Sequence, residues 1–399
     1  MSSTAESSPA PAILTPTEEV KSYLSFDDMD LPEELLRGIY SYGFQKPSMI
    51  QQKGIMPIKE GRDILAQAQS GTGKTGTFAI GSLCRVDPSL KRIQVLILVP
   101  VRELAQQIES VIKSMSVHMG VSVYSATGGT PLREDIRAIE KGCQYLIGTP
   151  GRVFDLMNRN VLARDQIRVL IFDEADQMLE DRFKEQVMCI LQKGFPKETQ
   201  IALFSATMDT EVIDVANKLL QNPVKILIDP DAVPLDGIKQ YVVSLEKEEW
   251  KYEVLCDLYQ QLNINQALIY CNKRQRAEWL AEKMSAQGFP LSFIHGEMDV
   301  EERKRRMNDF RKGTVRVLIS TDLLARGIDV QQVSLVINYE LPTQKENYIH
   351  RIGRAGRYGR KGVTINLISP EEARAVGEIE SHWKIVLEQL PNDLAKLPL

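Results

Sequence analysis

Short runs of apolar residues recur along the first half of the chain, and segments of helical length with mixed apolar and polar residues separate them. The runs span residues 64–66, 95–99, 145–147, 169–172, 201–204 and 225–228. Apart from Lys225 they are apolar throughout rather than at alternate positions, which is typical of strands covered on both faces. The first half is therefore predicted to form a parallel sheet wrapped by helices.

The second half repeats this rhythm. Its apolar runs span residues 240–245, 267–271, 291–295, 315–320, 335–339 and 363–368. Between the halves, residues 229–237 contain two prolines and a glycine that break the periodicity, so we expect a linker there. At 399 residues the chain exceeds the usual size of a single core. We predict a disordered tail over residues 1–23 and two α/β domains, over residues 24–228 and 238–399.

The loop after the first apolar run carries the residue types of a phosphate-binding site. Gly71 and Gly73 allow successive backbone N–H groups to converge on phosphate oxygens. Lys74 can pair with the β- and γ-phosphates, and the Thr75 hydroxyl can join a Mg²⁺ shell. The predicted ATP-binding loop comprises Ala68, Gln69, Ser70, Gly71, Thr72, Gly73, Lys74 and Thr75. Ala68 stands where the generic pattern has glycine. ATP with Mg²⁺ is the expected cofactor.

An acidic quartet, residues 173–176, comes directly after the apolar run that ends at residue 172. Acidic quartets alone are usually solvated surface. At the end of a buried strand, in a chain with a phosphate loop, Asp173 can hold Mg²⁺ through water and Glu174 can polarise an attacking water. The catalytic prediction is therefore Lys74, Asp173 and Glu174, with Thr75 and Asp173 at the metal.

Composition excludes several other classes of protein. No apolar run approaches the roughly 18 residues that span a bilayer, so no membrane association is expected. The five cysteines are an odd number without a close pair, which argues against a disulfide framework and indicates a reducing compartment. The formal net charge is −4, so any nucleic acid must be bound by local basic groups rather than by global charge.

Several motifs in one order resemble the DEAD-box RNA helicases. They are the phosphate loop, Asp-Glu-Ala-Asp at 173–176, Ser-Ala-Thr at 205–207, and the segments 43–51, 149–152, 325–329 and 350–357. The resemblance covers nearly everything from Phe26 onward. It implies two tandem RecA-like domains, with the family's adenine-recognition motif over residues 24–52. Segments 26–29, 35–40 and 323–333 are similar to the branch of the family that acts in translation initiation.

The resemblance also implies roles for single residues. Gln51 would read the adenine edge and Phe44 would stack on its face, although Phe44 alone could be core and Gln51 a helix cap. Asp329 would contact the ribose. Arg354 and Arg357 would reach the γ-phosphate, the alternative being a solvated basic helix face. In the same way, Ser205 and Thr207 would couple hydrolysis to strand separation.

For RNA, the family pattern indicates residues in both halves. They are Arg102, Gly128, Gly129, Thr149, Arg152, Asn272, Arg303 and Thr321. Contacts to phosphate and sugar would make binding independent of sequence, and the 2′-hydroxyl would distinguish RNA from DNA. Val101 stands where the pattern has threonine, so RNA binding is expected to be weaker for lack of one hydroxyl. Lys273 replaces another common threonine and adds a charge.

These interpretations predict an ATP-dependent RNA helicase that clamps single-stranded RNA and locally opens short duplexes. The resemblance implies that it would be a cytoplasmic monomer that joins scaffold and activator initiation factors and unwinds structured 5′ leaders of mRNA. The nearest alternative is a nuclear paralogue that clamps RNA at exon junctions, in which a Trp is expected where Leu324 stands. Two further candidate functions are a non-catalytic RNA scaffold and a DNA translocase. Intact Lys74, Glu174 and Arg357 argue against the scaffold.

Overall fold

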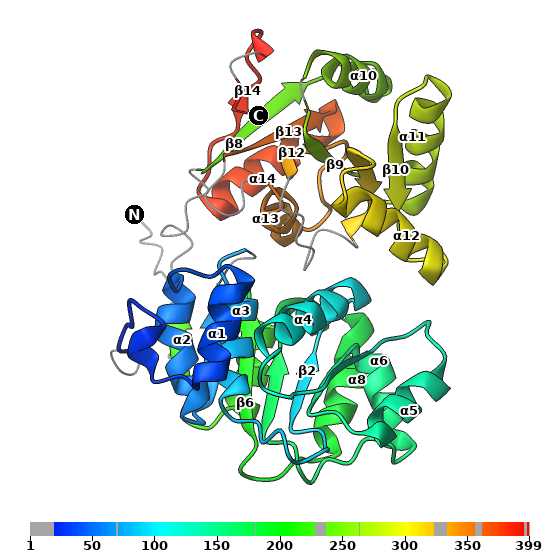
Figure 1. Ribbon diagram of the computed structural model, residues 1–399. Coiled ribbons are helices and arrows are strands. Elements are labelled where there is room, and N and C mark those ends of the chain that lie inside the picture. Colours follow the sequence, from blue (N-terminus) through cyan, green and yellow to red (C-terminus); the bar gives the residue numbers. More distant parts are fainter. Residues whose placement is uncertain are drawn as a thin grey trace, which may run out of the picture. The chain divides into compact units, whose positions relative to one another are not determined.

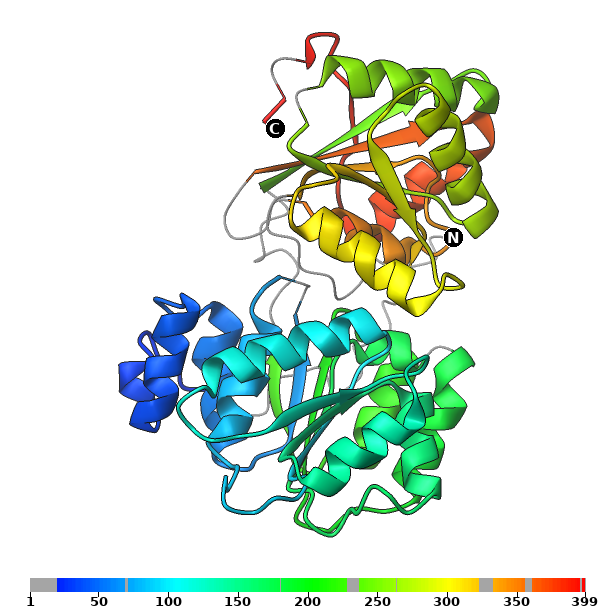
Figure 2. The ribbon, with the colours of Figure 1, turned by 45° about the vertical axis from the view of Figure 1, so that its right-hand side comes forward.

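The computed structural model describes residues 20–68, 71–179, 181–227, 237–262, 264–322, 333–355, 361–394 and 397–398. The predicted linker lies outside these residues except for Gly237, and so does most of the predicted tail. The described residues form two compact units, one ending with strand β7 (Val224–Leu227) and one beginning with strand β8 (Ile238–Ser244). Each unit is built around one sheet of seven parallel strands with helices on both faces (Figures 1 and 2).

The first unit has its sheet in the order β3-β4-β2-β5-β6-β1-β7. Its other strands are β1 (Ile64–Gln67), β2 (Val95–Leu98), β3 (Val123–Ala126), β4 (Tyr145–Gly148), β5 (Val169–Phe172) and β6 (Gln200–Ser205). Its helices are α1 (Glu33–Tyr42), α2 (Met49–Lys59), α3 (Lys74–Leu83), α4 (Arg102–Met115), α5 (Leu132–Lys141), α6 (Pro150–Asn158), α7 (Ala175–Met178), α8 (Asp181–Gln192) and α9 (Thr210–Leu219). A short 3-10 turn precedes α1 at Asp27–Met29.

The second unit has the sheet order β10-β11-β9-β12-β13-β8-β14. Its other strands are β9 (Gln266–Tyr270), β10 (Leu291–Ile294), β11 (Val317–Ser320), β12 (Val333–Asn338), β13 (Gly362–Ile368) and β14 (Glu388–Gln389). Its helices are α10 (Lys251–Gln261), α11 (Arg274–Ala286), α12 (Val300–Arg311), α13 (Lys345–Ile352) and α14 (Ala373–Trp383). Two 3-10 turns precede α10 and α14, at Glu248–Trp250 and Pro370–Glu372.

Burial explains why the apolar runs become strands. Every residue of β2, β4, β5, β9, β11 and β13 is buried, because helices cover both faces of the sheets. Helix α4 shows the complementary pattern, with Ile108, Ile112 and Met115 fully buried at helical spacing and its other face open. The predicted fold class, two parallel α/β sheets flanked by helices, is confirmed.

Two strands have no counterpart among the predicted runs. In β3, Tyr124 and Ser125 are only half-buried, and the strand pairs with β4 alone at the end of its sheet. In β14 there are two residues, and both are exposed. Both lie at an end of their sheet, where a strand is less covered than a central one, and they lack the apolar run by which β7 and β10, the other two end strands, can still be predicted.

Strand register brings the loops of the candidate site together. Strands β1 and β6 pair in parallel, with Gln67 opposite Ser205, and the Ala68 N–H donates to the Ser205 carbonyl at 3.0 Å. Strand β6 also pairs with β5, which ends at Phe172. The loops after β1, β5 and β6 therefore leave the same edge of the first sheet, where ligands bind in open α/β folds.

Candidate active site

The phosphate loop joins β1 to the N-terminus of α3. Gly71 and Gly73 have φ of 85° and 105°, a region that side chains other than glycine rarely adopt. A Cβ at Gly73 would also lie 2.5 Å from the Ser48 Oγ. The N-cap residue of α3 is Gly73, which has no side chain with which to cap the helix, and the positive dipole end of α3 favours an anion. Gln69 and Ser70 lie outside the described residues.

Lys74, the first residue of α3, is a buried cation in this site. Its side chain is 5% exposed, and its Nζ lies 3.9 Å from Glu174 Oε1. No hydrogen-bond partner for this Nζ is present among the described residues. A buried ammonium without acceptors is unfavourable on its own. Its position at the N-terminus of α3 therefore suits a phosphate group that would supply those acceptors.

Asp173 and Glu174 come directly after β5 and are both buried. Of the five described residues other than glycine with positive φ, Glu174 (57°) is the only buried one. Such strained conformations cluster at functional sites. Burial raises the pKa of the Asp173 carboxyl well above its ordinary value; the Lys74 ammonium opposes that rise and the Glu174 carboxylate reinforces it. A bound cation would favour the charged form of Asp173.

Magnesium fits this donor set. Thr75 lies in the first turn of α3, and Asp173 supplies a buried carboxylate from the neighbouring loop. No group of three or more His, Cys, Asp or Glu side chains that could hold a metal occurs in the part of the chain that the structure describes. Magnesium is commonly held by one or two protein oxygens together with substrate phosphates and water. Thr75 and Asp173 are consistent with that kind of site.

Ser205 and Thr207 lie against Asp176, the last residue of the acidic quartet. The Asp176 N–H donates to the Ser205 Oγ at 3.2 Å, and the Thr207 hydroxyl donates to Asp176 Oδ2 at 3.2 Å. Ser205 is also the residue whose carbonyl accepts from the phosphate loop at Ala68. These bonds join the end of β6 to both the acidic quartet and the phosphate loop.

Gln51 and Phe44 lie beside the phosphate loop. The Gln51 Oε1 accepts from the Ser48 N–H at 2.9 Å, and its Nε2 donates to the Gly73 carbonyl at 3.3 Å. Gln51 is thus a helix-capping residue of α2 and, at the same time, a neighbour of the loop. A Cβ at Gly76 would lie 2.5 Å from Gln51 Nε2 and 2.9 Å from the Phe44 ring. Both side chains therefore lie against the first turn of α3, next to the phosphate loop.

The RNA candidates of the first unit lie at the carboxyl ends of three adjacent strands, β2, β4 and β3. Arg102 is the first residue of α4 after β2, and Thr149 is the N-cap of α6 after β4. Gly128 and Gly129 come after β3; a Cβ at Gly128 would meet no atom within 4 Å, and Gly129 has φ of 84°. This edge presents backbone and small residues to which another backbone can approach closely.

Arg152 has a different place from the one its motif suggests. Its Nη2 donates to the Thr130 carbonyl at 2.7 Å, and its Nη1 forms an ion pair with the fully buried Asp135. Tyr124 donates to the same carboxylate at 2.7 Å. The guanidinium therefore ties the loop after Gly129 to α5 and α6, and this geometry favours a positioning role for Arg152 over the expected direct phosphate contact.

The RNA candidates of the second unit are also held internally. The Asn272 Nδ2 donates to the Leu341 carbonyl at 2.8 Å, and its Oδ1 accepts from Arg351 at 2.7 Å. Arg303, on α12, is 4% exposed and donates to the Gly296 carbonyl at 3.4 Å. Thr321 comes after β11 and is half-buried. Contacts within the unit thus occupy the Asn272 side chain and also its N–H, which donates to Glu340 Oε2 at 2.7 Å.

Arg351 is a residue whose importance the sequence did not reveal. It is completely buried, and it donates to Asp322 Oδ1 at 2.5 Å and to the Glu340 carbonyl at 2.7 Å, besides its bond to Asn272. Arg354 is 2% exposed and donates to the His350 carbonyl at 3.1 Å. A solvated basic face is therefore wrong for these two arginines. Arg357 and Asp329 lie outside the described residues. The only sequence signal for Arg351 was its place in the motif at 350–357.

A phosphate loop, a buried lysine and two buried carboxylates at the strand ends of one of two parallel α/β units define a nucleoside-triphosphatase of the helicase class. Comparison with protein families agrees: residues 48–215 match the DEAD/DEAH box helicase family, and residues 250–359 match the helicase conserved C-terminal domain. The chain belongs to the DEAD-box family of ATP-dependent RNA helicases, in its eIF4A-like group.

Individual relatives cover almost the whole chain. The "ATP-dependent RNA helicase eIF4A" of Chaetomium globosum is 51% identical over 373 residues, which are 94% of each chain. The "Eukaryotic initiation factor 4A" of Caenorhabditis elegans is 50% identical over 94% of this chain and 92% of its own. Among solved structures, S. cerevisiae Dbp5 bound to RNA and ADP BeF3 has a TM-score of 0.87 at 36% identity, over 93% of this chain and 96% of its own. Within the described residues, no helix combines the length and the apolar character needed to span a membrane.

Proposed function

We propose that this helicase acts in translation initiation, where it hydrolyses ATP while clamping single-stranded RNA and opens short duplexes in the 5′ leaders of mRNA. Relatives named as initiation factor 4A, 50% to 52% identical over nearly their full length, support this role. The proposal includes a cytoplasmic location and scaffold and activator initiation factors as partners. The chain would join them as a monomer.

The buried Lys74 ammonium beside Glu174 is the observation that carries the ATPase part of this proposal. The N–H groups of Gly71 and Gly73 and the Lys74 ammonium would bind the phosphates of ATP. Thr75 and Asp173 would hold Mg²⁺, which neutralises charge on the phosphates when bound. Glu174 would orient the attacking water and accept its proton.

Coupling to RNA would run through the acidic quartet. Ser205 and Thr207 bond Asp176, two residues from Glu174, so a shift at the end of β6 would be felt at the catalytic carboxylate. RNA would lie along the carboxyl ends of β2, β3 and β4, and along those of β9 and β11 in the second unit. We assign these contacts to the sugar-phosphate backbone, which makes them independent of sequence. Arg354 and Arg357 would act on the γ-phosphate and Asp329 on the ribose.

ATP turnover with RNA, with DNA of the same sequence and with neither tests the enzymatic part. We expect stimulation by RNA alone, and Lys74→Ala should abolish turnover in all three. Equal stimulation by DNA would indicate a translocase instead. Turnover that no nucleic acid changes would contradict RNA coupling.

A translation extract tests the role in initiation. Two reporter mRNAs that differ only in a stable hairpin in the 5′ leader are translated with added wild-type protein or with Glu174→Gln. We expect the variant to inhibit the structured reporter selectively. Equal effects on both reporters, together with co-purification of splicing proteins, would favour the nuclear paralogue.

A further inference from the structure

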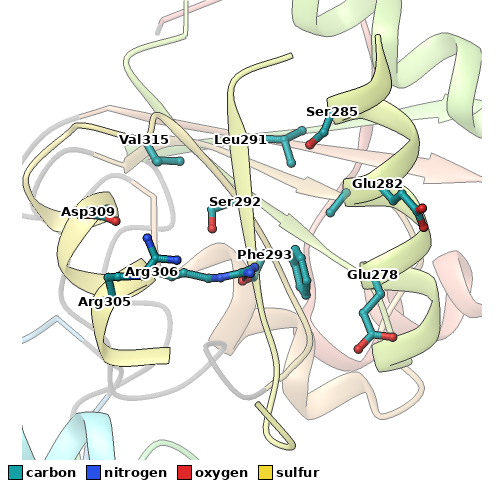
Figure 3. Close-up of a pocket in the computed structure, with 11 residues that line it drawn as sticks. Glu278, Glu282, Ser285, Leu291, Ser292, Phe293, Arg305, Arg306, Asp309 and Val315 are labelled. Carbon is teal, nitrogen blue, oxygen red and sulfur yellow. Dashed lines mark hydrogen bonds between the residues drawn. The ribbon is translucent and has the colours of Figure 1, made fainter. Parts of the chain in front are cut away.

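Strand β10 forms one end of the second sheet and pairs only with β11 in the described part of the unit. Its free long edge lies in a groove of about 620 Å³ between α11 and α12 (Figure 3). Leu291, Ser292 and Phe293, which line the groove, are each only half-buried. An open strand edge is a template for pairing with another extended chain.

The α11 side of this groove is acidic. Glu278 and Glu282 line it one helical turn apart, and Figure 3 shows them on the helix to one side of β10, with α12 on the other. Glu278 pairs with His295 at 2.9 Å. Glu282 is exposed and has no ion pair among the described residues. The α12 side is mixed, because Arg305 and Arg306 line it with Asp309, and both arginines bond Glu302.

Arg306 covers the middle of the open edge. Its Nη1 donates to the Phe293 carbonyl at 3.0 Å, and its guanidinium lies 4.1 Å from the centre of the Phe293 ring. Its Nε also bonds Glu302 at 2.7 Å, so Glu302 can retain the arginine when the contact to Phe293 is given up. A backbone N–H of an added strand would take the place of the guanidinium at the Phe293 carbonyl.

We propose that β10 docks an extended segment of a partner protein that carries basic residues at every second position. Successive side chains of a strand point to opposite faces of a sheet. Basic side chains on the α11 face would meet Glu282 and Glu278, and their aliphatic stems would cover Leu291 and Phe293. Main-chain hydrogen bonds to β10 would supply affinity, and the alternating charge would supply specificity.

The test uses the full-length chain and a labelled ten-residue peptide in which Thr and Lys alternate. A peptide of the same composition, with five Lys followed by five Thr, serves as the control for charge alone. We expect the alternating peptide to bind more tightly and to slow amide hydrogen exchange over 291–294. Equal binding of both peptides, or protection that leaves 291–294 unchanged, would overturn the proposal.

Charge reversal gives the sharper comparison. Glu282→Lys should weaken binding of the alternating peptide about tenfold, because like charges would face each other. Glu253→Lys, at an exposed carboxylate of α10, is the matched control and should change binding less than about twofold. A Thr-Glu peptide should bind Glu282→Lys better than wild type. Equal losses in both lysine variants would reduce the effect to general electrostatics and overturn the site.

Discussion

The two units have the same sheet, strand for strand, and differ in the loops at the ends of those strands. The first sheet runs β3-β4-β2-β5-β6-β1-β7, and adding seven to each number gives the order of the second. After β1 comes the phosphate loop; after β8, its counterpart, come Leu245 and a 3-10 turn at Glu248–Trp250. After β5 come Asp173 and Glu174. The comparison teaches that this scaffold supplies strand ends, and that the loops on them decide the chemistry.

The two units also differ in how the buried cations Lys74 and Arg351 are hydrogen-bonded. In the first unit the Lys74 Nζ has no hydrogen-bond partner among the described residues. In the second unit, buried Arg351 bonds Asp322, Asn338, Glu340 and Asn272. A satisfied network rigidifies its surroundings, whereas a buried ammonium that is near a carboxylate but lacks a hydrogen-bond acceptor can gain from a ligand that supplies one. Lys74 in the first unit is therefore suited to bind a phosphate of ATP, whereas Arg351 in the second unit has a structural role.

We expect the largest effect on ATP turnover from removing Arg357, the arginine of the second unit that we assign to the γ-phosphate. Arg357→Ala should lower RNA-stimulated ATP turnover by about 10³-fold or more, because an arginine finger stabilises transition-state charge. Arg357→Lys should restore little, since an ammonium lacks the forked geometry. RNA binding without nucleotide, measured alongside, should survive.

Arg374→Ala, at a side chain of α14 that is 90% exposed, is the matched control and should cost less than about threefold. If Arg357→Lys turns over ATP at nearly the wild-type rate, the second unit has no such catalytic arginine.

The next test compares two glutamates at corresponding positions in the two units. Glu174 is the second residue after β5, and Glu340 is the second after β12. Glu174→Gln should reduce turnover by about 10²-fold or more, because the general base is lost. Glu340 accepts from the Asn272 N–H at 2.7 Å, so Glu340→Gln should weaken RNA binding and leave turnover at saturating RNA nearly unchanged. Similar losses of saturated turnover in both variants would remove the distinction between the units.

Much of this arrangement can be predicted from the sequence because its causes are local. Central strands are covered on both faces and read as apolar runs, as in β5 and β9. The phosphate loop requires glycine at fixed spacing, since Gly71 and Gly73 have positive φ. Both signals depend on neighbouring residues alone, so they can be recognised without the structure.

The roles of Arg152 and Arg351 could not be predicted from the sequence, because they depend on contacts with residues distant in the chain. Arg152 contacts Thr130 and Asp135, and Arg351 contacts Asn272, 79 residues away. Nothing in the local sequence distinguishes an arginine that meets a buried carboxylate from one that meets a phosphate. The strained backbone of Glu174 is likewise imposed by its surroundings, since glutamate has no local preference for positive φ.

The pH dependence of the free energy of unfolding gives a third test, which concerns Asp173 in the first unit. Burial raises the pKa of Asp173 from 3.8 to about 7. A carboxyl that holds its proton more tightly in the folded state makes the free energy of unfolding fall as pH rises from 3.8 to about 7. In ligand-free protein, Asp173→Asn should therefore gain stability relative to wild type across this window. Urea unfolding at several pH values measures the difference.

The exposed Asp257 of α10 provides the control, because Asp257→Asn should show no such trend. Adding Mg²⁺ with ATP should shrink the difference at pH 7 by stabilising the charged Asp173. A constant difference from pH 4 to pH 7 would mean that Asp173 is not a high-pKa group.

The smallest effect concerns Val101, which the structure places at the N-cap of α4 with no side-chain cap and 6% exposure. Val101→Thr supplies a hydroxyl whose oxygen can accept from an N–H in the first turn of α4, so the free energy of unfolding should rise by about 1 kcal/mol. The same hydroxyl can still donate its proton to an RNA phosphate, and RNA binding should tighten while RNA-free turnover stays unchanged. Val111→Thr, within α4 and 8% exposed, adds a hydroxyl away from the cap and should destabilise instead. Greater stability with unchanged RNA affinity would show that the hydroxyl serves the helix alone.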